Sequence, residues 1–122
     1  MSAESDRSAL KIAVVGPCAS GKSTLVQALE KQGYHARQIA QEHSYVPDMW
    51  EVMTQPDILI YLDASYNTCT KRKNLDWTPV EYQVQVERLA YARQRCDLYV
   101  DSEEATPEEV ASIVIEFLKS AE

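Results

Sequence analysis

Two kinds of segment alternate along this chain, as judged from the order of its apolar and polar residues. Short runs such as 10–15 are nearly all apolar and contain β-branched side chains. Longer segments between them carry apolar side chains every three or four residues. The first pattern is typical of strands buried on both faces, and the second is typical of amphipathic helices. The chain is therefore predicted to alternate strands with helices.

Residues that commonly begin or end helices set the bounds of these elements. Gly33 ends the first helix, and Thr78-Pro79-Val80-Glu81 and Thr106-Pro107-Glu108-Glu109 are capping boxes with proline at the first helical position. The expected strands are Leu10–Val15, Tyr34–Ala40 (a polar edge strand), Asp57–Asp63 and Leu98–Asp101. The expected helices are Lys22–Gln32, Ser65–Lys73, Pro79–Arg95 and one that starts at Thr106.

This order of elements predicts the fold class. Strands that alternate with helices form parallel sheets with right-handed crossovers. We expect an α/β protein, namely a three-layer α/β/α domain with a mostly parallel sheet of about four strands. In such sheets, ligands bind outside the carboxyl ends of the strands.

Composition and net charge limit the number of domains and the classes of partner. The 122 residues suit one domain over 1–122, with a flexible tail at 1–8. A net charge of −7 disfavours nucleic acid and anionic membranes as partners, and no apolar run approaches the roughly 20 residues that span a bilayer. Three widely spaced cysteines predict neither a disulfide framework nor a metal site, and they suit a cytoplasmic protein.

The segment between the first strand and the first helix carries the strongest chemical signal. It matches the pattern G-x-x-x-x-G-K-[ST] of a phosphate-binding loop, in the required context of strand, turn and helix. Its backbone N–H groups are expected to surround phosphate at the helix N-terminus. The expected nucleotide-binding residues are Gly16, Pro17, Cys18, Ala19, Ser20, Gly21, Lys22, Ser23 and Thr24.

Three side chains of this loop have individual roles in the prediction. Lys22 is expected to reach the β- and γ-phosphates and to act in catalysis as a positive charge. The hydroxyl of Ser23 is expected to ligate Mg²⁺, and that of Thr24 lies near the α-phosphate. The implied cofactors are thus ATP and Mg²⁺.

A carboxylate is also needed to complete the Mg²⁺ shell. Glu42 and Asp63 both follow predicted strands, and each is a candidate metal residue beside the alternative of an ordinary solvated carboxylate. Glu42 is slightly favoured, because its strand would lie next to the first strand. His43 is either a base or acceptor-binding group or a plain loop histidine.

Three further motifs follow the loop. They are the "YLD" of Tyr61–Asp63, the basic segment Lys71–Lys73 and the "CDLYVD" of 96–101. Together they resemble P-loop kinases of the nucleoside, nucleotide and shikimate group. The resemblance implies that Arg72 serves as a catalytic lid residue and Arg88 as a clamp on phosphate or acceptor. It also implies that 102–105 lies against adenine.

The chain departs from that group in its middle. Only 41–56 occupies the space where these kinases carry an extra strand and a substrate-binding helical insert. The resemblance implies a small-molecule kinase that transfers the γ-phosphoryl group of ATP to an unidentified acceptor. The short middle favours the alternative of a nucleotide-binding module or slow ATPase that acts as a sensor or partner subunit. A third reading is a protein that binds nucleotide to fold or to form a homodimer.

Overall fold

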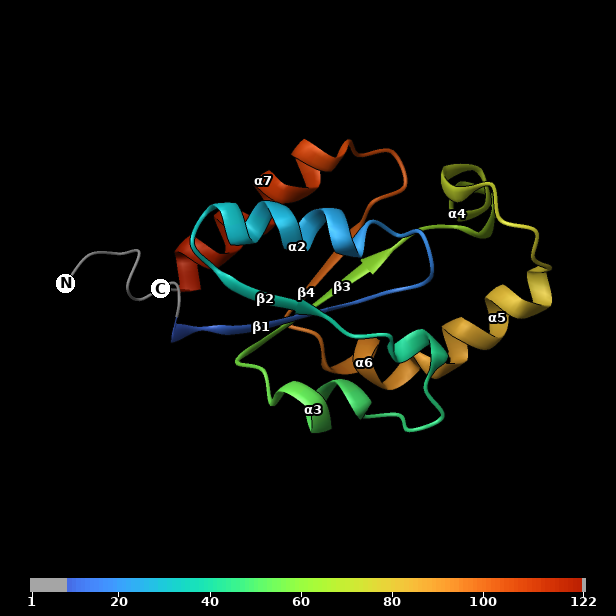
Figure 1. Ribbon diagram of the computed structural model, residues 1–122, viewed down its shortest axis with the longest axis horizontal. Coiled ribbons are helices and arrows are strands. Elements are labelled where there is room, and N and C mark those ends of the chain that lie inside the picture. Colours follow the sequence, from blue (N-terminus) through green and yellow to red (C-terminus); the bar gives the residue numbers. More distant parts are fainter. Residues whose placement is uncertain (1–8, 122) are drawn as a thin grey trace.

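The protein forms a four-stranded parallel sheet with helices on both faces, in a computed structural model that describes residues 9–121 (Figure 1). The strands are β1 (Lys11–Val15), β2 (His35–Gln38), β3 (Ile58–Asp63) and β4 (Leu98–Asp101), in the order β2-β1-β3-β4. The predicted three-layer α/β/α class is confirmed. The tail predicted at 1–8 lies outside the described residues.

The sequence pattern of each strand matches its place in the sheet. β1 and β3 are central, with Val14 paired to Ile60, and their side chains are nearly all buried. β2 pairs with only one neighbour, and three of its four residues are exposed. An edge strand needs apolar side chains on fewer positions, which is why β2 is polar. The prediction of an edge strand there is confirmed.

Two apolar cores lie on the two faces of the sheet. Helices α2 (Lys22–Lys31) and α7 (Pro107–Ala121) cover one face, where Leu29 and Val114 are fully buried. The opposite face packs beneath α3 (Met49–Thr54), α5 (Pro79–Arg88) and α6 (Ala90–Arg95), as Figure 1 shows. Its core contains Trp50 and Leu89.

Side-chain caps fix several helix starts. The Thr78 hydroxyl accepts the N–H of Glu81 at the start of α5. At the start of α7, Thr106 and Glu109 exchange two hydrogen bonds, of 3.0 and 3.1 Å, as a full capping box. Helix α4 (Tyr66–Lys73) is capped by Ser65. These caps satisfy N–H groups that have no partner within the helix.

The single helix predicted for Pro79–Arg95 is wrong, because the chain breaks it at Leu89 into α5 and α6. Leu89 is fully buried and serves as the end of one helix and the start of the next. The Gln41 side chain donates a hydrogen bond of 3.3 Å to the Arg88 carbonyl. A side chain that inserts into the helical hydrogen-bond ladder is a known cause of a kink. Periodicity alone carries no sign of such a distant contact.

The middle of the chain is short but folded. Residues Gln41–His43 form the 3₁₀ turn η1, and α3 follows it. Trp50 is 6% exposed and stacks on Tyr91, with ring centroids 6.2 Å apart. Trp50 therefore belongs to the core. Among residues 9–121, no helix combines the length and apolar character needed to cross a bilayer.

Candidate phosphate site

The glycine-rich loop leaves β1 at the carboxyl edge of the sheet and leads into α2. A Cβ on Gly16 would lie 2.2 Å from the Leu62 carbonyl oxygen, so a side chain cannot fit there without moving the backbone. Gly21 has a φ of 105°, which favours glycine, and it is the residue before α2. These two positions explain why the loop needs its two glycines.

The N-terminus of α2 is open toward this loop. No described side chain caps the helix at Gly21. The first N–H groups of a helix have no partner within it, and the helix dipole places positive potential there. An anion is the complementary ligand for such an end.

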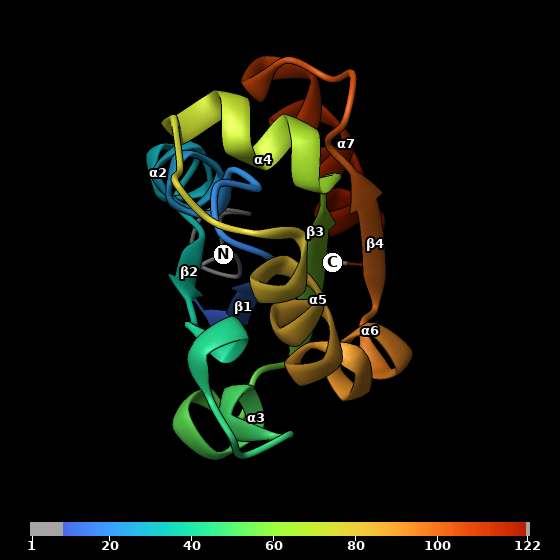
Figure 2. The same cartoon turned by 90° about the vertical axis from the view of Figure 1, so that its right-hand side faces the viewer.

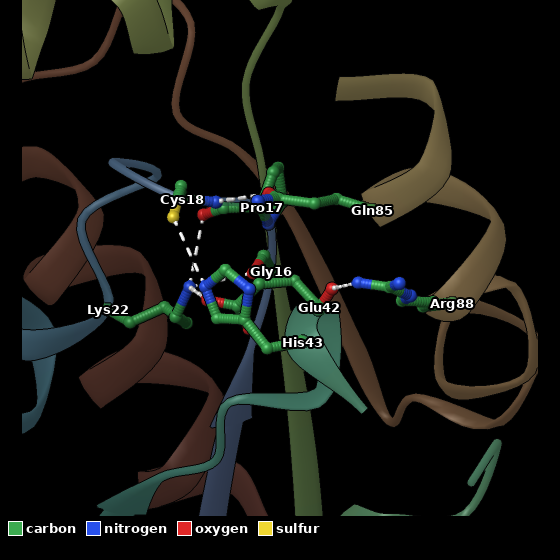
Figure 3. Close-up of polar contacts among 8 residues, drawn as sticks. All are labelled: Gly16, Pro17, Cys18, Lys22, Glu42, His43, Gln85 and Arg88. Atoms are coloured by element: carbon green, nitrogen blue, oxygen red, sulfur yellow. Dashed lines mark hydrogen bonds and ion pairs between the residues drawn. The ribbon is translucent and has the colours of Figure 1, made fainter. Parts of the chain in front are cut away.

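Lys22 lies at the centre of the loop, although its side chain is only 8% exposed. Its ammonium donates to the carbonyl oxygens of Gly16, at 2.7 Å, and Pro17, at 3.0 Å. It also forms a buried ion pair with Glu42, with 2.8 Å between Nζ and Oε2 (Figure 3). Three oxygen partners hold the ammonium at one point beside the helix N-terminus.

Helix α5 fixes the loop and the turn that carries Glu42 in place. The buried Gln85 accepts the N–H of Cys18 at 3.0 Å. One turn further, the Arg88 guanidinium donates to the Glu42 carbonyl at 3.3 Å and lies over the Tyr45 ring. Figure 3 shows both contacts reaching across from the same helix. No local pattern pointed to Gln85, because its role depends on a contact with a residue 67 positions away.

Arg72 crosses from α4 to the outer side of the loop. Its guanidinium donates to the carbonyl oxygens of Ala19 and Ser20, each at 3.3 Å, and to both the hydroxyl and the carbonyl of Ser102. It therefore ties the loop to the residue that follows β4. Figure 1 shows α4 and α5 on the side of the sheet toward which the strand arrows point, and Figure 2, viewed from that side, shows α4 above α5.

A cavity of about 340 Å³ opens between these elements. It is lined by loop and α2 residues 18–25, by Arg72 and Lys73 of α4, and by Glu42. Its far wall is formed by Ser102, Ala105, Pro107 and Val110. The predicted residues Cys18 to Thr24, Glu42 and Arg72 thus line one cavity, whereas Gly16, Pro17, Asp63 and Arg88 do not.

Asp63 and Arg88 are the exceptions outside the loop, because neither is among the residues that line the cavity. The Asp63 carboxylate accepts hydrogen bonds from the Ala64 N–H and the Tyr99 hydroxyl. Burial, together with this hydrogen bond, raises the pKa of Tyr99 to about 12. The Arg88 guanidinium contacts the Glu42 turn from the outside. Both side chains support neighbours of the loop rather than face the space beside it.

His43 lies closer to the loop than the sequence indicated. Its Nε2 is 3.6 Å from Cys18 Sγ and 3.9 Å from Glu42 Oε2. Its position directly after Glu42 in the sequence was the only available signal for this arrangement.

Neither a scan of protein-family models nor a search of curated proteins finds a match to this chain. The function of the cavity is therefore argued from its geometry.

Proposed function

We propose that the chain binds a nucleoside triphosphate with Mg²⁺ in the cavity beside the glycine-rich loop. The observation that carries the proposal is the buried Lys22 ammonium, held next to the open N-terminus of α2. A fixed cation and several oriented N–H groups together match the charge of a polyphosphate. The cavity next to them provides the space.

The Mg²⁺ ion that accompanies the triphosphate would be held by Ser23 and Glu42. Ser23 is exposed to the cavity, and Glu42 lies at its inner end with Oε1 buried and without a hydrogen-bond partner among the described residues. A hydroxyl and a carboxylate are hard oxygen ligands of the kind that Mg²⁺ prefers. Glu42 is favoured over Asp63, because Asp63 does not line the cavity.

The nucleoside would lie toward the far wall of the cavity. Ser102 and Ala105 follow β4, and Pro107 and Val110 begin α7, so this wall combines backbone polar groups with an apolar surface. An adenine ring has the same combination of an apolar face and polar edges. The preference for ATP over GTP rests on the resemblance to P-loop kinases.

We assign the reaction as transfer of the γ-phosphoryl group to a small acceptor, with Lys22 and Arg72 as the charge-stabilising residues. Phosphoryl transfer depends on positioning and on neutralising charge in the transition state. Arg72 spans the loop and Ser102 and lines the cavity, so its guanidinium lies beside the space proposed for the phosphates. The free cysteines fit a reducing cytoplasmic location.

A second candidate, a nucleotide-binding module or slow ATPase, is favoured by one observation. The short middle segment is used to cover the sheet, since Gln41 is fully buried and Trp50 lies in the core. Little of that segment remains to form a pocket for an acceptor. In this case turnover would be slow and would not depend on an added acceptor.

An assay of ADP release with a panel of phosphate acceptors distinguishes the two candidates. For a kinase, one acceptor class stimulates ADP release, and Arg72→Ala lowers kcat by about a hundredfold or more. Lys71→Ala, an exposed neighbour on the same helix, is the matched control and should leave kcat unchanged. ADP release that no acceptor stimulates would refute the kinase and support the module.

A further inference from the structure

Three metal-ligating side chains of different chemistry meet beside the loop. Cys18 comes from the loop, and Glu42 and His43 come from η1, yet one potential ligand atom of each lies within 4.8 Å of the other two. Cys18 Sγ and His43 Nε2 are only 3.6 Å apart. The spacing of the cysteines predicted no cysteine metal site, because Cys18 and the Glu42–His43 pair come from two separate segments of the chain.

We propose that Cys18, Glu42 and His43 form a binding site for a borderline-soft divalent cation of the zinc class. In a tetrahedral zinc site, bonds of about 2.0–2.3 Å place neighbouring ligand atoms roughly 3.3–3.8 Å apart. The observed separations of 3.6 and 3.9 Å are close to that range. Three protein ligands leave a fourth position open to water or to another ligand.

The ligand set selects the type of metal. Thiolate and imidazole groups favour zinc and its neighbours among the transition metals, whereas Mg²⁺ prefers oxygen ligands. The Cys18 thiolate supplies negative charge to the ion, and the Glu42 carboxylate is shared with the Lys22 ammonium. The Cys18 thiol gives up its proton to solvent when the metal binds.

The two carboxylate oxygens of Glu42 differ in their partners. Oε2, which lies 3.9 Å from His43 Nε2, also accepts from the Lys22 ammonium, whereas Oε1 is buried and has no hydrogen-bond partner among the described residues. Glu42 as a whole is 4% exposed. A buried carboxylate oxygen without a partner is costly, so a cation beside it removes a penalty.

The site is held in shape and is accessible from solvent. Gln85 fixes the Cys18 backbone and Arg88 fixes the Glu42 backbone, so α5 positions both ligand segments. The His43 side chain is 56% exposed, so this ligand can be reached from solvent. The site shares Glu42 with the proposed Mg²⁺ site and is therefore tested in the absence of nucleotide.

Cobalt titration of protein prepared without a histidine tag tests this site. A Co²⁺–thiolate bond gives a strong charge-transfer absorption in the near ultraviolet. We expect this band to saturate at one equivalent of Co²⁺, to disappear when Zn²⁺ is added, and to be absent with Mg²⁺ alone. In Cys18→Ser the band should be lost, and in His43→Gln the affinity should fall at least about tenfold.

Matched controls use the other residues of the same kinds. Cys96→Ser and His35→Gln change a half-buried cysteine and an exposed histidine that are not part of the group, and both should titrate like the wild type. The far-ultraviolet circular dichroism of each variant shows whether it is folded. Absence of the band in the wild type, or its persistence in Cys18→Ser, would overturn the proposal, whereas nucleotide binding could still hold.

Discussion

Lys22 and Glu42 form a buried ion pair, and such pairs have a specific energetic signature. Removing one partner leaves an uncompensated buried charge and costs about 3–5 kcal/mol, whereas replacing both partners with neutral groups costs far less. Lys22→Met alone should therefore lower the free energy of unfolding by about 3 kcal/mol or more. Adding Glu42→Gln should restore at least half of that loss. Urea unfolding at pH 7 measures both, and a double variant no more stable than the single one would contradict the account.

Gly16 is a second residue whose role can be measured. A Cβ at this position would meet the Leu62 carbonyl oxygen at 2.2 Å, and this oxygen belongs to the central strand β3. We expect Gly16→Ala to cost about 2–3 kcal/mol, in the range of overpacked cores. Gly33→Ala is the control: its φ of 89° is also unfavourable for alanine, but no atom lies within 4 Å. Equal losses in the two variants would show that close approach to Leu62 does not matter.

At the scale of elements, α5 contacts both parts of the site. Gln85 binds the glycine-rich loop, and Arg88 binds the turn that carries Glu42. Gln85→Leu would leave the Cys18 N–H without its acceptor in a half-buried position, at a cost of about 1–3 kcal/mol. The loop would also lose its fixed shape, so MgATP binding should weaken.

The matched control for this prediction lies on the same helix. Gln83 is exposed, and Gln83→Leu should change stability by no more than about 0.5 kcal/mol. Urea unfolding and a MgATP titration on both variants make the comparison. If Gln85→Leu binds MgATP as well as Gln83→Leu does, the loop does not depend on α5.

Local sequence patterns predicted most of the elements. The apolar runs gave β1 and β3, and the capping residues Thr78 and Thr106 gave the starts of α5 and α7. These features depend on neighbours within a few positions, which the sequence displays directly. The break at Leu89 was missed because it depends on Gln41, which is distant in the chain.

The same distinction applies to the site. The loop residues from Gly16 to Thr24 follow a local pattern, and Glu42 was favoured because its strand would adjoin β1, as it does. The contact between His43 and Cys18 joins residues 25 positions apart. The hydrogen bond from the Cys18 N–H to Gln85 joins residues 67 positions apart. No spacing rule in a single sequence can indicate such contacts, because the three-dimensional packing creates them.

For the whole molecule, alkaline pH offers a test of the packing on the sheet. Burial raises the pKa of Cys69 to about 11 and that of Tyr82 to about 12. Each group therefore holds its proton more tightly in the folded than in the unfolded chain. Above about pH 9, where the unfolded groups begin to ionise, folding stability should fall as pH rises toward these values.

Thermal unfolding measured from pH 7 to pH 11 follows this effect. The midpoint should be nearly constant at first and should then decline, and the decline should be shallower in Tyr82→Phe, which cannot ionise at this position. A midpoint that stays flat up to pH 11 would show that these groups are not buried as described.

The central claim is that the loop around Lys22 binds a triphosphate, and calorimetric titration with MgATP tests it most directly. We expect one equivalent to bind the wild type and Lys31→Met, which removes an exposed lysine from the other end of α2. Lys22→Met, checked for folding by circular dichroism, should bind at least about tenfold more weakly, because the fixed cation is gone. Absence of binding to the wild type, or equal binding by Lys22→Met, would contradict the claim.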